Sequence, residues 1–185
     1  GITELPHPRS HMAVISGLEY LEQINSYELG QMATVWRKII RRSFLDDNNI
    51  FSPEINMGED VPYSFTALVM AKRIIVTSKC YYLYRHNPKS LTGTEWRPTA
   101  KGLYEKCILN SRLVYQITDK VPESYPHTWA SVQDSASYTL RRMLQLFGKM
   151  EDKERREFRG LCKKDFSKNK HIKPLLSKKQ YISYL

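Results

Sequence analysis

The feature that most restricts the fold is a helix start at residues 59–69. Pro62 follows the acidic pair Glu59-Asp60, and proline is favoured in the first turn of a helix, where its missing N–H would have had no intrahelical partner. The apolar side chains that follow recur at i, i+4, i+7 and i+8: Val61, Phe65, Leu68 and Val69. This pattern predicts a helix that begins at Asp60 and buries one face for about three turns.

The position of the acidic pair allows two interpretations. Glu59 and Asp60 would lie at the positive end of the helix dipole, which favours ionised carboxylates. Aspartate is a common N-cap residue, so Asp60 is one side chain that would stabilise the helix start. A fixed, charged carboxylate beside a loop also suits a general base. The spacing alone leaves both interpretations open.

Two helices are predicted before this segment. Ser16-Gly17-Leu18-Glu19 has the spacing of a capping box and predicts a short helix to about Asn25. Residues 34–44 are predicted as a second helix, with basic side chains opposite an apolar face. The apolar face consists of Val35, Trp36, Ile39 and Ile40.

Two runs after residue 70 predict β-structure. Residues 73–76 contain a β-branched run, residues 80–85 contain a tyrosine-rich run, and a short turn joins them. This arrangement predicts an antiparallel hairpin. Apolar periodicity predicts three later helices, at residues 101–116, 128–147 and 149–164. The predicted fold class is α+β and mainly α, with helices around a small antiparallel β-hairpin, followed by a C-terminal helical bundle.

The basic charge is concentrated in the last quarter of the chain. The formal net charge is +10, and residues 141–185 carry +9 of it. Such a surface is typical of contact with a polyanion, meaning acidic lipid headgroups, a nucleic acid or a phosphorylated substrate. A solvated helical face that keeps the protein soluble is the equally simple alternative.

The cysteines and the apolar runs restrict the cellular setting. The three cysteines lie far apart and are odd in number, which favours thiols of a reducing compartment over a disulfide framework or a zinc site. No apolar run approaches the roughly 18 residues that a membrane span needs. We therefore expect a cytoplasmic protein, with peripheral contact to the inner face of the membrane as an open alternative.

Hydrogen-bond donors gather in the loop after the tyrosine-rich run. Arg85, His86, Lys89 and Ser90 lie within six positions of one another. Arginine offers a fork of donors and serine a hydroxyl, so this loop is a candidate diphosphate site. Surface groups without a ligand are the alternative interpretation.

Four segments together resemble a known enzyme family. They occur in the order seen in the second half of family 2 glycosyltransferases of the GT-A fold, and they look like the bacterial enzymes that build surface polysaccharides. The segments are residues 35–38, the pair at 59–60, residues 71–74 and residues 82–92.

The resemblance implies roles for named residues. In this family the aspartate of the Glu-Asp pair is the catalytic base of an inverting transfer from a nucleotide sugar, so Asp60 would be that base and Glu59 would support it. Trp36 and Lys38 match a Trp-x-Lys element on the acceptor side, although Arg37 stands where asparagine is expected. The positions near the donor would be Arg85, His86 and Ser90.

The sequence also departs from the family. Members begin with a nucleotide-binding half that ends in an Asp-x-Asp metal motif, and this sequence has neither. Asp46-Asp47 is no substitute, because the two residues are adjacent in sequence. The chain therefore looks like a C-terminal fragment that binds no metal itself, is inactive alone, and would be completed by Mg²⁺ or Mn²⁺ in the whole enzyme.

These expectations divide the chain into three parts. Residues 1–12 resemble a cloning scar, residues 13–98 would complete the catalytic domain, and residues 99–185 would form a helical region with a basic tail. The expected partners are a nucleotide sugar, a saccharide or lipid-linked acceptor, and an acidic membrane that contacts residues 141–185. The alternative function is a helical module that binds acidic membrane or nucleic acid through this basic quarter, although no nucleic-acid motif occurs in the sequence.

Overall fold

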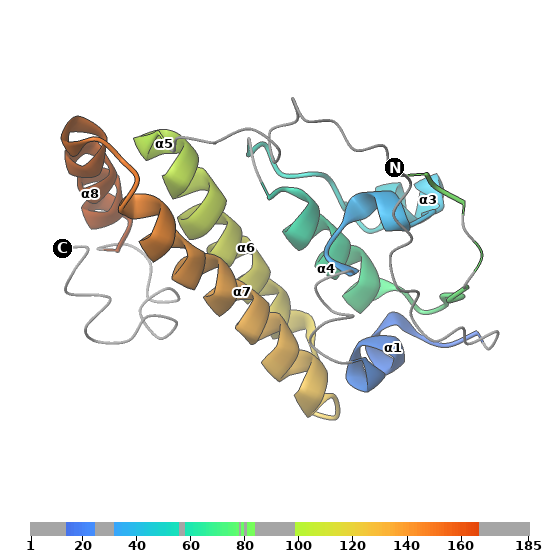
Figure 1. The fold of residues 1–185 in the computed structure, drawn as a ribbon. Helices are drawn as coiled ribbons and strands as arrows, with labels where there is room; N and C mark the ends of the chain where they lie inside the picture. Colours follow the sequence, from blue (N-terminus) through green and yellow to red (C-terminus); the bar gives the residue numbers. More distant parts are fainter. Residues whose placement is uncertain are drawn as a thin grey trace.

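The described part of the protein consists of helices joined by loops. The computed structural model describes residues 14–24, 32–55, 58–77, 79, 81–83 and 99–166 (Figure 1). Its α-helices are α1 (Gly17–Gln23), α3 (Arg42–Asp47), α4 (Asp60–Met70), α5 (Ala100–Leu103), α6 (Asn110–Ile117), α7 (Pro126–Phe147) and α8 (Asp152–Phe166). The 3-10 turns are η1 (Val35–Arg37) and η3 (Thr118–Lys120), and a π-helical segment, η2 (Tyr104–Leu109), joins α5 to α6.

The larger core lies where α1, α4, α6 and α7 meet. In Figure 1 α6 and α7 lie side by side, α4 lies next to α6, and α1 lies near the first turns of α7. Phe65 of α4, Val114 of α6 and Val132 of α7 are buried together there. The predicted apolar face of residues 61–69 is confirmed, because its members belong to this core or pack against it.

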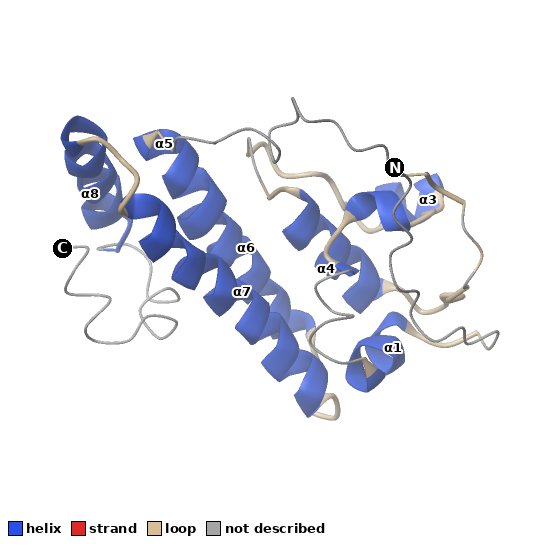
Figure 2. Cartoon of the chain, viewed as in Figure 1, coloured by secondary structure: helices blue, strands red, loops and turns tan. Residues whose placement is uncertain are grey.

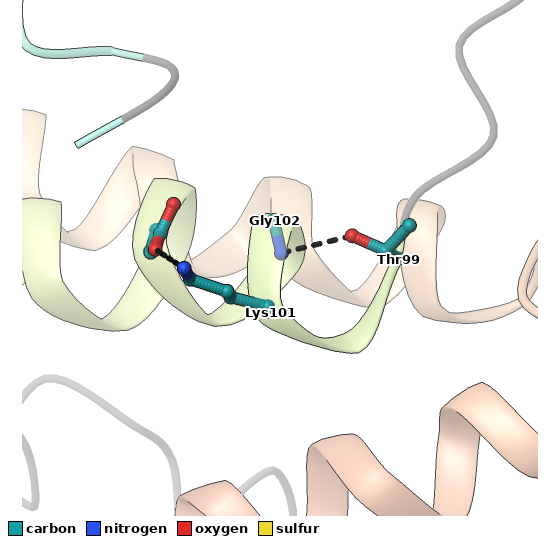
Figure 3. Close-up of polar contacts among 4 residues, drawn as sticks. Thr99, Lys101 and Gly102 are labelled. Carbon is teal, nitrogen blue, oxygen red and sulfur yellow. Dashed lines mark hydrogen bonds and ion pairs between the residues drawn. The ribbon is translucent and has the colours of Figure 1, made fainter.

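A smaller core lies where α5, η2 and α8 meet the last turns of α7. Leu103, Ile108, Met150, Phe158 and Cys162 are buried together in it. Thr99 caps α5, since its hydroxyl accepts a hydrogen bond from the Gly102 N–H at 3.1 Å (Figure 3). Lys101 also forms an i,i+4 ion pair with Glu105 at 3.6 Å. These local contacts fix the start of the long helical segment that leads into α6.

The first helix packs closely on α4. The predicted capping box is confirmed, with Glu19 N–H donating to the Ser16 hydroxyl and Ser16 N–H donating to the Glu19 carboxylate. Gly17 N–H donates to the Ala71 carbonyl at 2.8 Å. A Cβ atom on Gly17 would lie 1.8 Å from the backbone oxygen of Leu68. The two helices therefore approach at a point where only glycine fits.

The predicted antiparallel hairpin, and with it the α+β class, is wrong. Figure 2 shows helices and loops and no strand in the described part of the chain. Ile74 instead forms an isolated antiparallel bridge with Ile15, through N–H···O distances of 2.7 and 3.2 Å. Residues 81–83 are exposed, so they gain little of the burial on which β-propensity depends. Residues 78, 80 and 84–98 lie outside the described part.

The predicted helix at residues 34–44 is also wrong. The chain makes the short turn η1, runs extended through Arg41 and begins α3 only at Arg42. Lys38 ends the turn, because its N–H donates to the Val35 carbonyl and its ammonium reaches back to the carbonyls of Met32 and Thr34. Ile39, expected on the apolar face, is 90% exposed.

The later helices are confirmed with shifted bounds. The π-helical segment interrupts the predicted helix at residues 101–116, α7 begins at Pro126, and α8 begins at Asp152. No helix in the described ranges is long and apolar enough to cross a bilayer. The basic residues at 167–185 lie outside these ranges, so the acidic-membrane contact stays a prediction.

Candidate active site

The acidic pair lies where a turn becomes α4. Gly58 has a φ of 84°, Glu59 is the N-cap residue, and Asp60 is the first helical residue. The predicted helix start at Asp60 is therefore confirmed. The Gly58 carbonyl accepts a hydrogen bond from Val61 N–H at 3.2 Å, which closes the turn. Glu59 makes no side-chain capping bond, so its carboxylate does not stabilise the helix start by capping.

Asp60 is half-buried, and its carboxyl group is a stronger base than usual. Burial raises the pKa of Asp60, and the negative charge of Glu59 raises it further. The backbone N–H groups of Asp60 and Val61 and the charge of Lys38 act in the opposite direction. The helix start thus favours ionised Asp60 as expected, but burial outweighs this effect on the pKa. A raised pKa brings a carboxylate closer to the value that suits a general base.

Lys38 lies within the electrostatic reach of Asp60. Its ammonium donates to the Met32 carbonyl and, at 2.6 Å, to the Thr34 carbonyl. Burial lowers the pKa of Lys38 to about 8, the charge of Asp60 raises it, and the charge of Arg37 lowers it. The fold therefore brings Lys38 close to Asp60, although 21 positions separate them in sequence.

Titration of Lys38 measures this proximity. By NMR of its side chain, we expect a midpoint near pH 8, and a lower one in Asp60→Asn, because the charge that raises the Lys38 pKa is then gone. Since the folded pKa lies below the unfolded value, the contribution of Lys38 to stability increases as pH rises from about 8 toward about 10.4. An unchanged midpoint in Asp60→Asn would show that the two groups do not interact.

An open hollow of about 560 Å³ adjoins the acidic pair. Glu59 and Asp60 line it together with side chains of η1, α3 and the loop after α3, including Phe51. A second hollow of about 220 Å³ adjoins the first, and both are lined by Phe51 and Tyr63. The first hollow falls within the roughly 300–1,000 Å³ typical of small-molecule sites. Asp60 therefore borders an open hollow of the size of a small-molecule site.

Of the predicted substrate-binding residues, Trp36 and Lys38 lie in the described part of the chain. Trp36 stacks on Tyr82 with ring centroids 5.3 Å apart, and the Arg37 guanidinium lies 5.0 Å from the Trp36 ring centroid. Lys38, two residues on, is turned toward backbone carbonyls. Arg85, His86 and Ser90 lie outside the described residues. The structure thus brings together Glu59, Asp60 and Lys38 of the predicted set.

One residue at this site was missed in the sequence analysis. Asn110, the first residue of α6, is 1% exposed, and its Nδ2 donates to the Gly58 carbonyl. Asn110, Val114 and Ile117 fall at i, i+4 and i+7, and all are buried. A polar residue on an otherwise apolar helix face was the available signal. The contact with Gly58 joins distant parts of the chain and leaves no local pattern.

The described residues do not fit the divalent metal that the family resemblance implies. Within these residues, no group of three His, Cys, Asp or Glu side chains is placed to hold a metal ion. Asp46, which lines the hollow, forms an ion pair with Arg42 at 3.5 Å.

Comparisons with known proteins give a partial relationship. No family model and no solved structure matches the chain. The chain is 31% identical over 98 residues to the uncharacterized glycosyltransferase EpsJ of Bacillus subtilis strain 168. The match covers 52% of this chain and 28% of that protein, so the chain spans less than a third of its relative. Over about half of its length, the chain is thus related to a glycosyltransferase.

Proposed function

We propose that this chain is the C-terminal part of an inverting glycosyltransferase of family 2 and GT-A fold, with Asp60 as general base. The observation that carries the proposal is the position of Asp60, half-buried, with a raised pKa, at the edge of a 560 Å³ hollow. The partial similarity to a glycosyltransferase supports sugar transfer over other uses of a basic carboxylate.

The proposed reaction is a single displacement. An acceptor hydroxyl attacks the anomeric carbon of a nucleotide sugar, a new C–O bond forms, and the bond from that carbon to the diphosphate oxygen breaks. Asp60 takes the hydroxyl proton, and the nucleoside diphosphate leaves with the bonding electron pair. Glu59 contributes by keeping the Asp60 carboxylate basic through its negative charge.

The described residues supply the acceptor side of this reaction. Phe51 is 68% exposed and, with Tyr63, lines both hollows. Aromatic faces of this kind offer apolar surface to a bound ring, while the carboxylates at one end fix its polar groups. We therefore assign the hollow beside Asp60 to the saccharide acceptor.

The donor side would come from further polypeptide. Apolar side chains on and near η1, and on residues 81–83, are exposed: Val35, Ile39, Tyr81, Tyr82 and Leu83. Exposed apolar side chains that gather in one part of a protein are typical of a surface that another element covers. This exposure supports a nucleotide-binding part that packs beside Asp60 and completes the site.

A paired transfer assay tests the proposal. One sample is the present chain, and the other is the same chain joined to the nucleotide-binding half of a family 2 enzyme or to its own upstream sequence. Both are given a panel of nucleotide sugars and saccharide acceptors, and released nucleoside diphosphate is measured. We expect nucleoside diphosphate to be released by the longer protein and not by the present chain, and this release to depend on the acceptor. Transfer by the present chain would contradict the division of the site, and no transfer by the longer protein with any donor would contradict the function.

A further inference from the structure

We infer that Asn110 is a positioning residue, which holds the turn that carries Glu59 and Asp60 against the start of α6. Its Nδ2 donates to the carbonyl of Gly58, immediately before the acidic pair. The attachment of the turn to α6 does not depend on what the protein does, whereas the effect of Asn110 on sugar transfer rests on the proposed function.

Helices α4 and α6 run side by side in the same direction. Their first ends meet where Asn110 contacts Gly58. Beyond the other end of α6, the Lys120 ammonium of η3 approaches the sulfur of Met70, the last residue of α4, at 3.8 Å. Between these points Phe65 and Val114 are buried in the same core. The core therefore fixes α6 against the body of α4, and the Asn110 hydrogen bond extends this attachment to the turn before α4.

The π-helical segment changes the rotation of α6 relative to α5. Segment η2 ends at Leu109, one residue before Asn110. A π-helical turn contains an extra residue relative to an α-helical turn, so it rotates the face of every residue that follows. Within α6, Asn110 shares its buried face with Val114 and Ile117 because the three residues lie at i, i+4 and i+7.

The contact is close from both sides. Gly58 has a φ of 84°, and a Cβ atom built on it would lie 2.7 Å from Nδ2 of Asn110. Glycine is therefore required both by the backbone conformation and by the space that the amide occupies. The Oδ1 atom of Asn110 has no hydrogen-bond partner within the described residues. The Asn110 amide thus acts as a donor to the Gly58 carbonyl, and this hydrogen bond accounts for a polar side chain at a buried position.

The role of Asn110 differs from ordinary core packing. The Gly58 carbonyl also accepts Val61 N–H, so loss of Asn110 does not leave that carbonyl without a partner. We therefore expect its replacement to cost less stability than a core truncation. The turn, however, would lose its attachment to α6, and the burial of Asp60 would decrease.

The first test measures Asp60 directly in the present chain. Carboxyl carbon NMR gives the titration midpoint of Asp60 in the wild type, in Asn110→Leu and in the matched control Val114→Ala, which lies one turn further on the same buried face. We expect the midpoint to move down by roughly 0.5 or more in Asn110→Leu, because a freed carboxyl is better hydrated. We expect Val114→Ala to lower stability with an unchanged midpoint. An unchanged midpoint in Asn110→Leu, or an equal change in the control, would overturn the inference.

A second variant approaches the same contact from the other partner. Gly58→Ala places a methyl group against Nδ2 of Asn110, so it should shift the Asp60 midpoint in the same direction. Asn110→Ser, which is smaller and polar, serves if either variant fails to fold. A folded Asn110→Ser that titrates like the wild type would contradict the role of the amide.

The activity arm separates this inference from the proposed function. In the complete enzyme, Asn110→Leu should lower kcat by roughly 10-fold or more with little change in KM, since a displaced base affects the chemical step more than acceptor binding. If Asn110→Leu shifts the Asp60 midpoint while Asp60→Asn retains full transfer, the positioning role holds and the proposed function fails. If Asp60→Asn abolishes transfer while Asn110→Leu changes neither midpoint nor kcat, the proposed function holds and the positioning role fails.

Discussion

Replacing Asp60 by asparagine in the complete enzyme is expected to lower sugar transfer by at least about 10²-fold, the smallest loss typical of a positioned general base. Asparagine has nearly the same shape and can still begin a helix, but its amide cannot take the acceptor proton. The measurement is the initial rate of nucleoside diphosphate release with saturating donor and acceptor. Near-normal turnover would leave Asp60 as the first residue of α4 and nothing more.

The control for this variant is Glu59→Gln. It removes a neighbouring charge that raises the pKa of Asp60, so it should shift the acid limb of the rate profile to lower pH and reduce transfer much less.

The stability of Asp60→Asn should respond in the opposite sense from its activity. Because the pKa of Asp60 is raised in the folded state, its contribution to stability is present at low pH and is lost as pH rises through that value. Asp60→Asn should therefore be at least as stable as the wild type at neutral pH.

Replacing Gly17 by alanine is expected to destabilise the protein by about 3 kcal/mol, the upper end of the range for overpacked cores. The new methyl carbon would lie 1.8 Å from the backbone oxygen of Leu68. A clash with a backbone atom cannot be relieved by a side-chain rotation, so α1 would have to move away from α4. That movement would also disturb the 2.8 Å hydrogen bond from Gly17 N–H to the Ala71 carbonyl. Urea unfolding followed by circular dichroism measures the change.

The chain offers a matched glycine for comparison. Gly160 lies inside α8 and is exposed, and a Cβ atom built on it would meet no atom within 4 Å from the described residues beyond its own stretch of helix. Gly160→Ala should therefore stabilise the protein, by up to about 1 kcal/mol, because alanine is the better helix former. The two substitutions are chemically identical, and their opposite signs would isolate the effect of the contact. Equal effects at both positions would contradict the close approach of α1 and α4.

The parts of the fold that the sequence predicted are those that depend on neighbouring residues. The capping box at Ser16 and the helix start before Pro62 need only a few consecutive positions, and both are confirmed. The hairpin prediction was wrong because a β-branched run does not identify the segment with which it pairs. The backbone of Ile74 pairs with that of Ile15, which lies far from it in sequence. The helix prediction at 34–44 was wrong at a point where the Lys38 side chain bonds to the backbone carbonyls of Met32 and Thr34, contacts that apolar periodicity does not reveal.

The candidate site divides in the same way. Asp60 was identified from its own neighbours, and the structure confirms its place in the first turn of α4. The approach of Lys38 and the support from Asn110 depend on packing between segments that are distant in sequence. The net direction of the Asp60 pKa could not be predicted from the sequence for a related reason. The helix start, which favours the charge, can be read locally, whereas the burial that outweighs it is a property of the assembled protein.

The π-helical segment has a consequence for how this molecule tolerates insertions and deletions. It lies between the smaller core of α5 and α8 and the larger core of α4 and α6. A π-helical turn holds one residue more than an α-helical turn, so deleting one residue there would restore α-helical spacing and leave the later side chains of α6 on about the same face. A second deletion would turn those side chains by about 100°, and the hydrogen-bond donor beside Gly58 and the apolar residues that follow it would then face away together. The segment thus absorbs one change in length, whereas a further change would act on the turn before Asp60 and on the core at once.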